Sequence, residues 1–366
     1  MRVAFAVFLV LHGLIHLMGF ARAFNLAEIP ALKAEISQPM GLLWLAGALL
    51  LVLTAILLFA APALWPWVGL VALVVSQAAV ISDWSDARFG TLANLVGLAP
   101  VAVALLLRAP SGYAATFERE AQEGLARPGP TTAITEADLA PLPAPVAAYL
   151  RFTGAVGRPR PANLHMAFRG SMRKKATDDW MAVTGEQYSF FDTPTRLFYI
   201  RSRMYGLPFE GLHVYRDGRA SMRIRLAGLL EVVDASGPKM DQSETVTLLN
   251  DLFFLAPARL LDPSVTWTPV DALSAIATYT NAGQKVSATL RFDERGALTD
   301  FVTDDRYLSA DGVQYEALRW STPVQEYRDF GGLKLPALAE ARWHAPEGEY
   351  AYARFELLEI AHDVGG

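Results

Sequence analysis

Long apolar runs fill the first third of the chain, and alternating apolar and polar positions fill much of the rest. Four runs, each near the roughly 20 residues that a helix needs to cross a bilayer, predict four transmembrane helices. Trp65, Trp67 and Trp84 fall at the ends of these runs, as an aromatic interface belt would place them. A buried soluble helical core is the alternative, which the length and low charge of the runs disfavour. The runs lie at residues 3–20, 41–61, 64–82 and 89–107.

The predicted transmembrane domain, residues 1–110, makes this an integral, multi-pass protein of the cell membrane. Four spans place both chain ends on one side, but basic residues are balanced between the two sides, so the orientation stays open. The first run also imitates a signal peptide that ends in Ala-Arg-Ala. His12 and His16 interrupt the run, which favours an uncleaved helix.

From residue 162 the hydrophobic period falls to two, which predicts strands. Residues 111–160 form a linker with short helices at 113–125 and 143–153, separated by Arg-Pro-Gly-Pro at 127–130. Residues 161–366 form the β domain, in which one helix at 242–256 starts with a capping box of Asp241 and Glu244. The strands are predicted at 163–173, 181–191, 196–205, 211–217, 220–234, 274–280, 285–293, 297–305, 314–328, 333–344 and 350–361.

This order of elements indicates an α+β protein: an N-terminal four-helix transmembrane bundle, followed by one strongly curved antiparallel sheet with a few helices. We expect the sheet to form a half-barrel or barrel, with helices against its concave face. The length of 366 residues exceeds the roughly 250–300 at which a single core stops growing, so two domains are expected.

Composition excludes several classes of function. Charged residues make up only 19% of the chain and the net charge is −5, which argues against nucleic-acid binding. The absence of cysteine excludes disulfides, thiolate zinc sites and thiol nucleophiles.

Several segments resemble a bacterial family of membrane-anchored proteins known only as a domain of unknown function. The resemblance covers nearly the whole chain and implies no activity. The predicted β domain is also similar, at the level of fold, to the half-barrel of lipoprotein-carrier proteins, in which a concave sheet shelters acyl chains; that likeness is an analogy. The segments are LHGLIHLMGF at 11–20, GLLW at 41–44, DWSDARFGTLAN at 83–94, RFTG at 151–154, VDASGP at 233–238 and EYR at 326–328.

The apolar stretch 248–261 offers more hydrophobic surface than a helix on a sheet needs. We expect Phe253, Phe254 and Leu255 to line an acyl-sized pocket, with Trp320 and Trp343 as walls. Core packing is the alternative for this stretch.

Arginines alternate along the predicted strands, and residues two apart share a face. Arg201 with Arg203, and Arg223 with Arg225, would hold an anionic head group. The alternative is a solvated face on which they pair across strands with carboxylates such as Glu186 or Glu231. Apolar residues would occupy the opposite face: Phe168, Met172, Ile200, Met204, Met222, Ile224 and Leu226.

Ionisable residues also occur within the apolar third. His12 and His16 share one helical face, and Asp83 and Asp86 emerge on the same side of the predicted membrane as His16. They define a candidate metal or proton site. The alternative is that the histidines fix the helix bundle by hydrogen bonds. No cofactor is expected apart from this metal ion.

No glycine-rich phosphate loop, nucleophile elbow or His-Glu-x-x-His motif occurs, so the sequence indicates no enzyme. The favoured hypothesis is a membrane-anchored, non-enzymatic protein that binds a lipophilic or amphipathic ligand at the membrane surface. The rival is a metal- or proton-handling membrane protein centred on His12 and His16. A third hypothesis, a structural protein whose sheet edge recruits a partner strand, has no specific support.

Overall fold

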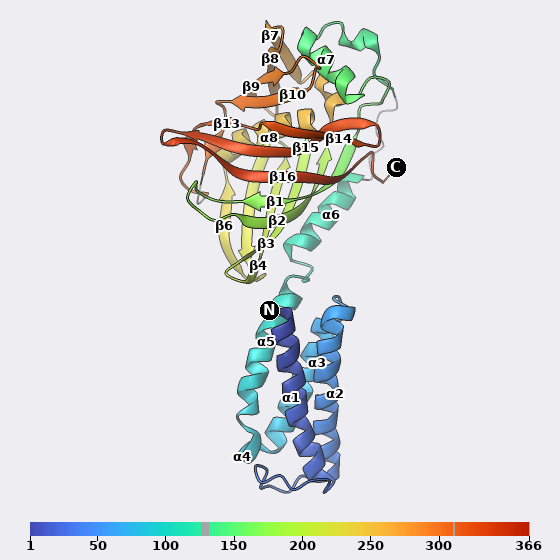
Figure 1. The fold of residues 1–366 in the computed structure, drawn as a ribbon, viewed down its shortest axis with the longest axis vertical. Coiled ribbons are helices and arrows are strands. Elements are labelled where there is room, and N and C mark those ends of the chain that lie inside the picture. Colours follow the sequence, from blue (N-terminus) through green and yellow to red (C-terminus); the bar gives the residue numbers. More distant parts are fainter. Residues whose placement is uncertain (126–131, 310–311, 366) are drawn as a thin grey trace. The chain divides into compact units, whose positions relative to one another are not determined.

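The computed structural model describes residues 1–125, 132–309 and 312–365, and the chain divides into two compact units (Figure 1). Met1–Gly112 is helical and is called the helical unit below. Tyr113–Gly366, the β unit, contains the sheet. The linker predicted at 127–130 lies outside the described residues.

Three helices of the helical unit, rather than the predicted four, are long and apolar enough to cross a membrane. The helix α5 has only 17 residues, which makes it about 25 Å long, shorter than the roughly 30 Å hydrocarbon core. The short helix α4 takes up part of the chain before it. The helices of this unit are α1 (Arg2–Ala23), α2 (Gln38–Ala60), α3 (Trp65–Ser82), α4 (Trp84–Ala87) and α5 (Gly90–Leu106).

Glycines bring α1 and α2 close together. A Cβ on Gly19 would lie 2.3 Å from the Trp44 ring, and one on Gly47 would lie 2.9 Å from the His16 ring. Small residues at helix contacts are typical of membrane bundles, in which van der Waals packing holds the helices together.

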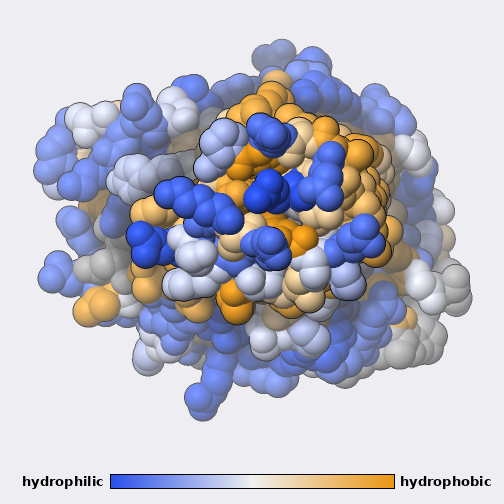
Figure 2. All heavy atoms as spheres, turned by 90° about the horizontal axis from the view of Figure 1, so that it is seen from below, coloured by the Kyte–Doolittle hydropathy of each residue, from blue (hydrophilic) through white to orange (hydrophobic). Residues whose placement is uncertain are grey.

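The outward-facing surface of the helical unit is apolar. Figure 2, which looks onto the end carrying the α1–α2 loop and α4, shows hydrophilic residues over that end and hydrophobic residues around its flank. Such a contiguous apolar flank is costly in water and marks a surface that meets lipid or protein. Exposed apolar residues of this flank include Leu11, Leu14, Ile15, Leu49, Ile56, Val74, Leu95 and Val96.

The β unit begins with α6 and α7, and α8 interrupts its strands. Gly154, at a φ of +74°, ends α7 in the left-handed conformation that glycine adopts without steric cost. The helices of the unit are α6 (Tyr113–Leu125), α7 (Ala144–Thr153), α8 (Pro238–Leu255) and the 3₁₀ turns η1 (Glu136–Leu139) and η2 (Pro257–Leu261).

One 14-stranded sheet, antiparallel at every pairing of neighbouring strands, forms most of the β unit, and β11 and β12 form a separate ladder. The strands are β1 (Asn163–Met172), β2 (Met181–Phe190), β3 (Thr195–Met204), β4 (Leu207–Arg216), β5 (Arg219–Leu226), β6 (Leu230–Ser236), β7 (Val265–Asp271), β8 (Ser274–Asn281), β9 (Gln284–Phe292), β10 (Leu298–Thr303), β11 (Tyr307–Leu308), β12 (Glu316–Ala317), β13 (Arg319–Ser321), β14 (Val324–Phe330), β15 (Leu333–Ala345) and β16 (Gly348–His362).

The sheet is open and curls around α8. Its strand order is β6-β5-β4-β3-β2-β1-β16-β15-β13-β10-β9-β8-β7, with β14 paired to β15, so β6 and β7 are the two ends of this order. The helix α8 contacts β5 and β6 near one edge, β8 and β9 near the other, and β15 between them. Figure 1 shows α8 behind β15, within the curl. The α+β class and the open half-barrel are therefore confirmed, and a closed barrel is wrong.

Local errors in the predicted elements have identifiable causes. The capping box is wrong because α8 begins at Pro238, and the Asp241 carboxylate instead accepts a hydrogen bond from the backbone N–H of Ala220. The predicted strand 220–234 is two strands, β5 and β6, joined by an apolar turn at 227–229. The sequence prediction also missed β7.

Candidate functional site

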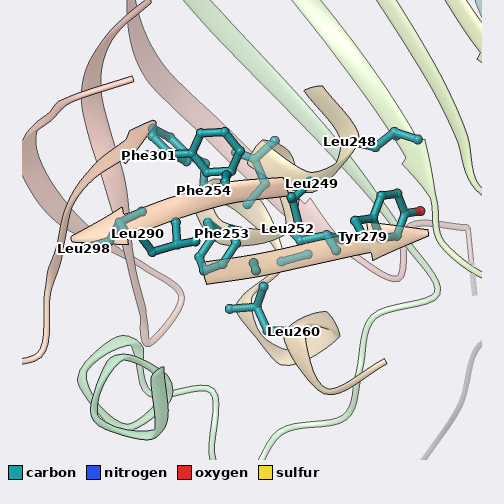
Figure 3. Close-up of a cluster of buried hydrophobic side chains, with 14 of the residues drawn as sticks. Leu248, Leu249, Leu252, Phe253, Phe254, Leu260, Tyr279, Leu290, Leu298 and Phe301 are labelled. Atoms are coloured by element: carbon teal, nitrogen blue, oxygen red, sulfur yellow. The ribbon is translucent and has the colours of Figure 1, made fainter. Parts of the chain in front are cut away.

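The helix α8 covers part of the concave face, where it contacts β5, β6, β8, β9 and β15. We call this part the helix-filled half. Phe253 is fully buried, and its ring meets Trp267 and Phe301 edge to face. Figure 3 shows Leu249, Phe253 and Phe254 among sheet side chains such as Leu290 and Leu298. Phe254 and Leu255 are buried in the same cluster. The structure thus places all three predicted pocket residues of α8 in packed core.

Trp320 and Trp343 belong to the same core. They are opposite one another on β13 and β15, and both are buried. The indole N–H of Trp320 donates to the Tyr352 hydroxyl at 3.2 Å, and the Trp343 ring stacks on that of Tyr352. These two tryptophans therefore line no open surface of the sheet in this conformation.

Buried charges fasten α8 to β3. The guanidinium of Arg196 donates to Asp251 at 2.9 Å and to Glu244 at 3.3 Å. Burial raises the pKa of Asp251. Burial acts in the same direction on Glu244, but the charges of Arg196, His213 and Arg306 outweigh it and hold the pKa of Glu244 below its ordinary value. Sequence reasoning missed this network because nothing local marks Arg196 as buried.

Beyond α8, strand side chains line much of the concave face among the described residues. Phe168, Gly185, Ile200, Gly211 and Ile224 are register partners across five strands. Directly opposite residues of antiparallel strands share a face. This row therefore lies on the same face as its neighbours two residues along each strand, including Arg196, which meets α8.

We call this apolar surface the methionine face. Four of the nine methionines of the chain lie on it, each partly exposed. Methionine is flexible and polarizable, and it is over-used at surfaces that accommodate varied apolar ligands. The methionine face consists of Met166, Phe168, Met172, Met181, Val183, Phe198, Ile200, Met204, Phe209, Ile224, Leu226 and Phe355.

Glycines allow large side chains to lie flat on the methionine face. A Cβ on Gly185 would lie 2.5 Å from the Phe168 ring, and one on Gly211 would lie 2.8 Å from Cγ1 of Ile200. The rings of Phe168 and Phe198 stack with centroids 5.1 Å apart. Aromatic and aliphatic residues therefore spread over the strands instead of projecting into the curl.

The sequence prediction that arginines and apolar residues occupy opposite faces is confirmed by the register. Arg201 and Arg225 both lie opposite Glu210, one position from Ile200 and Ile224 of the methionine face. Met222, predicted on the apolar face, lies opposite His213 on the concave side.

Three of the four arginines, Arg201, Arg223 and Arg225, contact carboxylates or an aromatic ring on the convex face. Arg201 lies 3.6 Å from Glu186, and Arg225 lies 3.6 Å from Glu231. The guanidinium groups of Arg223 and Arg225 lie over the ring of Tyr113, which begins α6. Arg203 is exposed and donates to the carbonyl of Gly206. The structure therefore does not bring these arginines together with Phe253, Phe254 and Leu255.

In the helical unit, three of the four predicted metal ligands, His12, His16 and Asp86, take part in separate polar contacts. His12 Nε2 lies 2.9 Å from Oδ1 of Asn94 and 3.3 Å from the Ser76 hydroxyl, which joins α1 to α5 and α3. His16 Nδ1 lies 3.1 Å from the carbonyl of His12. The contacts of His12 are those expected of a histidine that fixes a bundle, whereas His16 hydrogen-bonds within α1.

Asp83 and Asp86 lie at the α3–α4 corner. Asp83 is buried there, and the carboxylate of Asp86 accepts from the backbone N–H groups of Lys33 and Ala34 in the α1–α2 loop. Among the described residues, no three His, Cys, Asp or Glu side chains gather as a metal-binding group.

Two small cavities occur in the β unit. One of about 130 Å³ lies beside η2 and the end of β16, and one of about 30 Å³ lies between β2 and α8. Pockets for drug-sized ligands measure about 300–1,000 Å³, so neither cavity holds an acyl chain. Neither cavity is lined by residues of the methionine face.

Solved structures similar to this chain share little sequence with it. A DUF1329 family protein from Desulfovibrio piger is 15% identical, with a TM-score of 0.34, and the match covers 62% of this chain and 95% of that one. An outer-membrane lipoprotein-sorting protein domain from Vibrio parahaemolyticus is 10% identical, with a TM-score of 0.32 and coverages of 56% and 87%. A LolA superfamily protein from Nitrosomonas europaea is 8% identical, with a TM-score of 0.32 and coverages of 59% and 93%.

No curated protein matches this sequence. A family model described as a family of unknown function (DUF6544) matches residues 132–355. This match spans α7, α8 and most of the sheet, and therefore both the helix-filled half and the methionine face. Because it also covers more than half of the chain, the protein belongs to the DUF6544 family.

Proposed function

We propose that this protein is a membrane-anchored, non-enzymatic binding protein whose β unit receives a lipophilic or amphipathic ligand on the methionine face. The observation that carries the proposal is this face itself: partly exposed methionines around flat-lying aromatic rings, on the concave side of an open sheet. Core methionines would be buried, whereas these remain partly exposed. Burying their exposed area against an apolar ligand is favourable.

An acyl chain fits the dimensions of this surface. The face extends across β16, β1, β2, β3, β4 and β5. Adjacent strands lie roughly 4.8 Å apart, so these six strands extend over about 24 Å. Flat rows of Phe, Ile and Met offer dispersion contacts along that length without fixing one ligand shape.

The helical unit supplies the membrane anchor in this proposal. The helices α1, α2 and α3 are long and apolar enough to cross the bilayer, and the flank of the unit is apolar. The protein is then an integral membrane protein whose ligand comes from the lipid phase. Of the four arginines proposed for head-group contact, Arg203 is the one beside the end of the methionine face, next to Met204.

Native mass spectrometry of the full-length protein in mild detergent tests the proposal. We expect a lipid-sized adduct, which can be released and identified. Met172→Glu places a charge on the methionine face and should remove the adduct, because an acyl chain on that face would strip an ionised carboxylate of its water.

Ser171→Glu is the matched control. Ser171 is the neighbouring residue on β1, also half-exposed, and its side chain points to the convex face. This variant should retain the adduct. Equal adduct content in both variants would exclude the methionine face as the binding surface. A metal-sized adduct that disappears in His12→Ala would instead favour a metal-handling protein.

A further inference from the structure

Three hairpins turn at the same end of the sheet, where the methionine face ends. Their closing pairs are Met172 with Met181, Met204 with Leu207, and Leu226 with Leu230. The Ser202 hydroxyl donates to the carbonyl of Ala182 at 2.6 Å, which holds the β1–β2 and β3–β4 hairpins side by side.

Two of these turns carry large apolar side chains in the open. Tyr205 is 95% exposed, and Leu229 and Leu230 are 73% and 60% exposed. Leu207, beside Tyr205, is exposed as well. Single exposed apolar residues are ordinary, but a group on neighbouring turns marks a contact surface. We call Tyr205, Leu207, Leu229 and Leu230 the hairpin tips.

The backbone of these turns is also unfavourable for the residues that occupy it. Tyr205 and Ala227 have φ angles of 51° and 56°, in the left-handed region that favours Gly, Asn and Asp. The β4–β5 turn, at the opposite end of the same strands, follows the usual rule with Asp217 and Gly218. An aromatic ring at an exposed, strained tip has no local stabilising role in water.

Cations flank the hairpin tips. Lys174 and Lys175 are exposed in the β1–β2 turn, and Arg203 is exposed on β3. Asp178 and Asp179 lie in the same β1–β2 turn, where Asp178 accepts from the backbone N–H of Lys175. Apolar side chains bordered by Lys and Arg are the composition of protein surfaces that dip into an anionic lipid interface.

We propose that the hairpin tips dock into the head-group region of the bilayer that holds the N-terminal helices, with anionic lipid favoured by Lys174, Lys175 and Arg203. This inference rests on the membrane anchoring in the proposed function and names the surface that meets the lipid. Docking there presents the end of the methionine face, at Met172, Met181 and Met204, to the bilayer. An acyl chain then passes onto the face without crossing open water.

The covalent chain supports this assignment. Arg108, just after α5, donates to the carbonyl of Pro62 in the α2–α3 turn at 2.9 Å, so the chain leaves the helical unit at a helix end. Residues 107–112 then connect α5 to Tyr113, and six residues reach about 20 Å when extended. The Tyr113 hydroxyl donates at 2.9 Å to Glu231 of β6, next to Leu230. Leu230 of the hairpin tips is thus next in sequence to the residue that Tyr113, the first residue of the β unit, contacts.

Fluorophores on single cysteines test the docking in the full-length protein, because the natural chain has no cysteine. Tyr205→Cys and Leu229→Cys are labelled with an environment-sensitive dye and reconstituted in phosphatidylcholine–phosphatidylglycerol vesicles that contain doxyl-labelled lipid. Asp217→Cys is the matched control, since Asp217 is exposed and also has a positive φ of 53°. We expect several-fold stronger quenching at residues 205 and 229 than at residue 217.

The outcomes separate this proposal from the anchoring on which it rests. If the protein floats with the vesicles while residues 205 and 229 remain as water-exposed as residue 217, docking is wrong and anchoring stands. If the protein does not float, anchoring fails. Labels that are shielded from water but not quenched by the doxyl lipid would overturn lipid as the occupant and indicate a protein partner.

Charge reversal tests the preference for anionic lipid. Lys174→Glu/Lys175→Glu should reduce quenching at residue 205 in vesicles with phosphatidylglycerol and change little in phosphatidylcholine alone. The control is Lys285→Glu/Lys334→Glu, which changes the net charge by the same amount at two other exposed lysines of the β unit. It should leave quenching at residue 205 unchanged. An equal loss with both double variants would overturn the role of the β1–β2 lysines.

Discussion

The concave face of the sheet has one half that α8 fills and one half that, among the described residues, strand side chains line. In the helix-filled half, Leu249 and Phe253 are fully buried, and Arg196 joins the helix to the sheet. On the methionine face, Met172, Met181 and Met204 remain partly exposed. Both halves are apolar, yet the side chains of the first are buried by packing against one another, while the second keeps part of its apolar area exposed. An apolar sequence pattern therefore does not by itself distinguish core from binding surface.

The largest expected difference in the free energy of unfolding between the two halves comes from truncating one side chain in each. Phe253→Ala should lower the free energy of unfolding by about 3–5 kcal/mol, because it leaves a cavity in a closed core. Met181→Ala should cost about 1 kcal/mol, because solvent already reaches this side chain. Denaturant unfolding in detergent, followed by tryptophan fluorescence, measures both. Similar losses would show that the methionine face is packed as tightly as the core.

Local periodicity predicted which residues share a face of the sheet. Alternation placed Phe168, Ile200 and Met204 opposite the arginines, and the observed register agrees. It also left open whether Arg201 and Arg225 pair with Glu186 and Glu231, as they do. Both features depend on neighbouring positions along strands and across hairpins, so they are encoded locally.

The position of α8 could not be predicted in this way. The stretch that contains Phe253 and Phe254 is apolar on nearly every side, so its pattern fits a core helix and a pocket wall equally well. Which strands it covers depends on the curl of the whole sheet, and on contacts such as that of Arg196 with Asp251, 55 positions along the chain. The turn at Leu229 escaped prediction because its residues are apolar where turns are usually polar.

His213 lies where the two halves meet. The pH dependence of the free energy of unfolding therefore reports on that boundary. Its Nδ1 lies 3.9 Å from Glu244 of α8, and its ring meets that of Phe198 on the methionine face. Burial lowers the pKa of His213 from 6.5 to about 4. The unfolded chain therefore binds a proton that the folded chain rejects, and stability falls as the pH drops from about 6.5 towards 4.

His213→Gln should remove this part of the acid sensitivity. At about 1.4 kcal/mol per pKa unit, the wild type loses on the order of 2–3 kcal/mol more than the variant across that window. Unfolding free energies at several pH values between 4 and 8 measure the difference. Above pH 7 the histidine is neutral in both states, so the gap between the two proteins should stay constant there. A constant gap down to pH 4 would mean that His213 is solvated and that the boundary is open.

The smallest expected effect on the free energy of unfolding comes from exchanges that change the shape of a side chain but not its volume. Leu249→Met in the helix-filled half should cost up to about 1.5 kcal/mol, because a flexible side chain replaces a fixed one at a site without solvent. Met181→Leu should leave the free energy of unfolding within about 0.5 kcal/mol of the wild type, because its side chain is only partly enclosed. Since both exchanges conserve volume, a difference between them reports how closely the surroundings fit the side chain. Equal costs would show that the strand-lined half also demands one shape, and the adaptable surface required for an acyl ligand would then be absent.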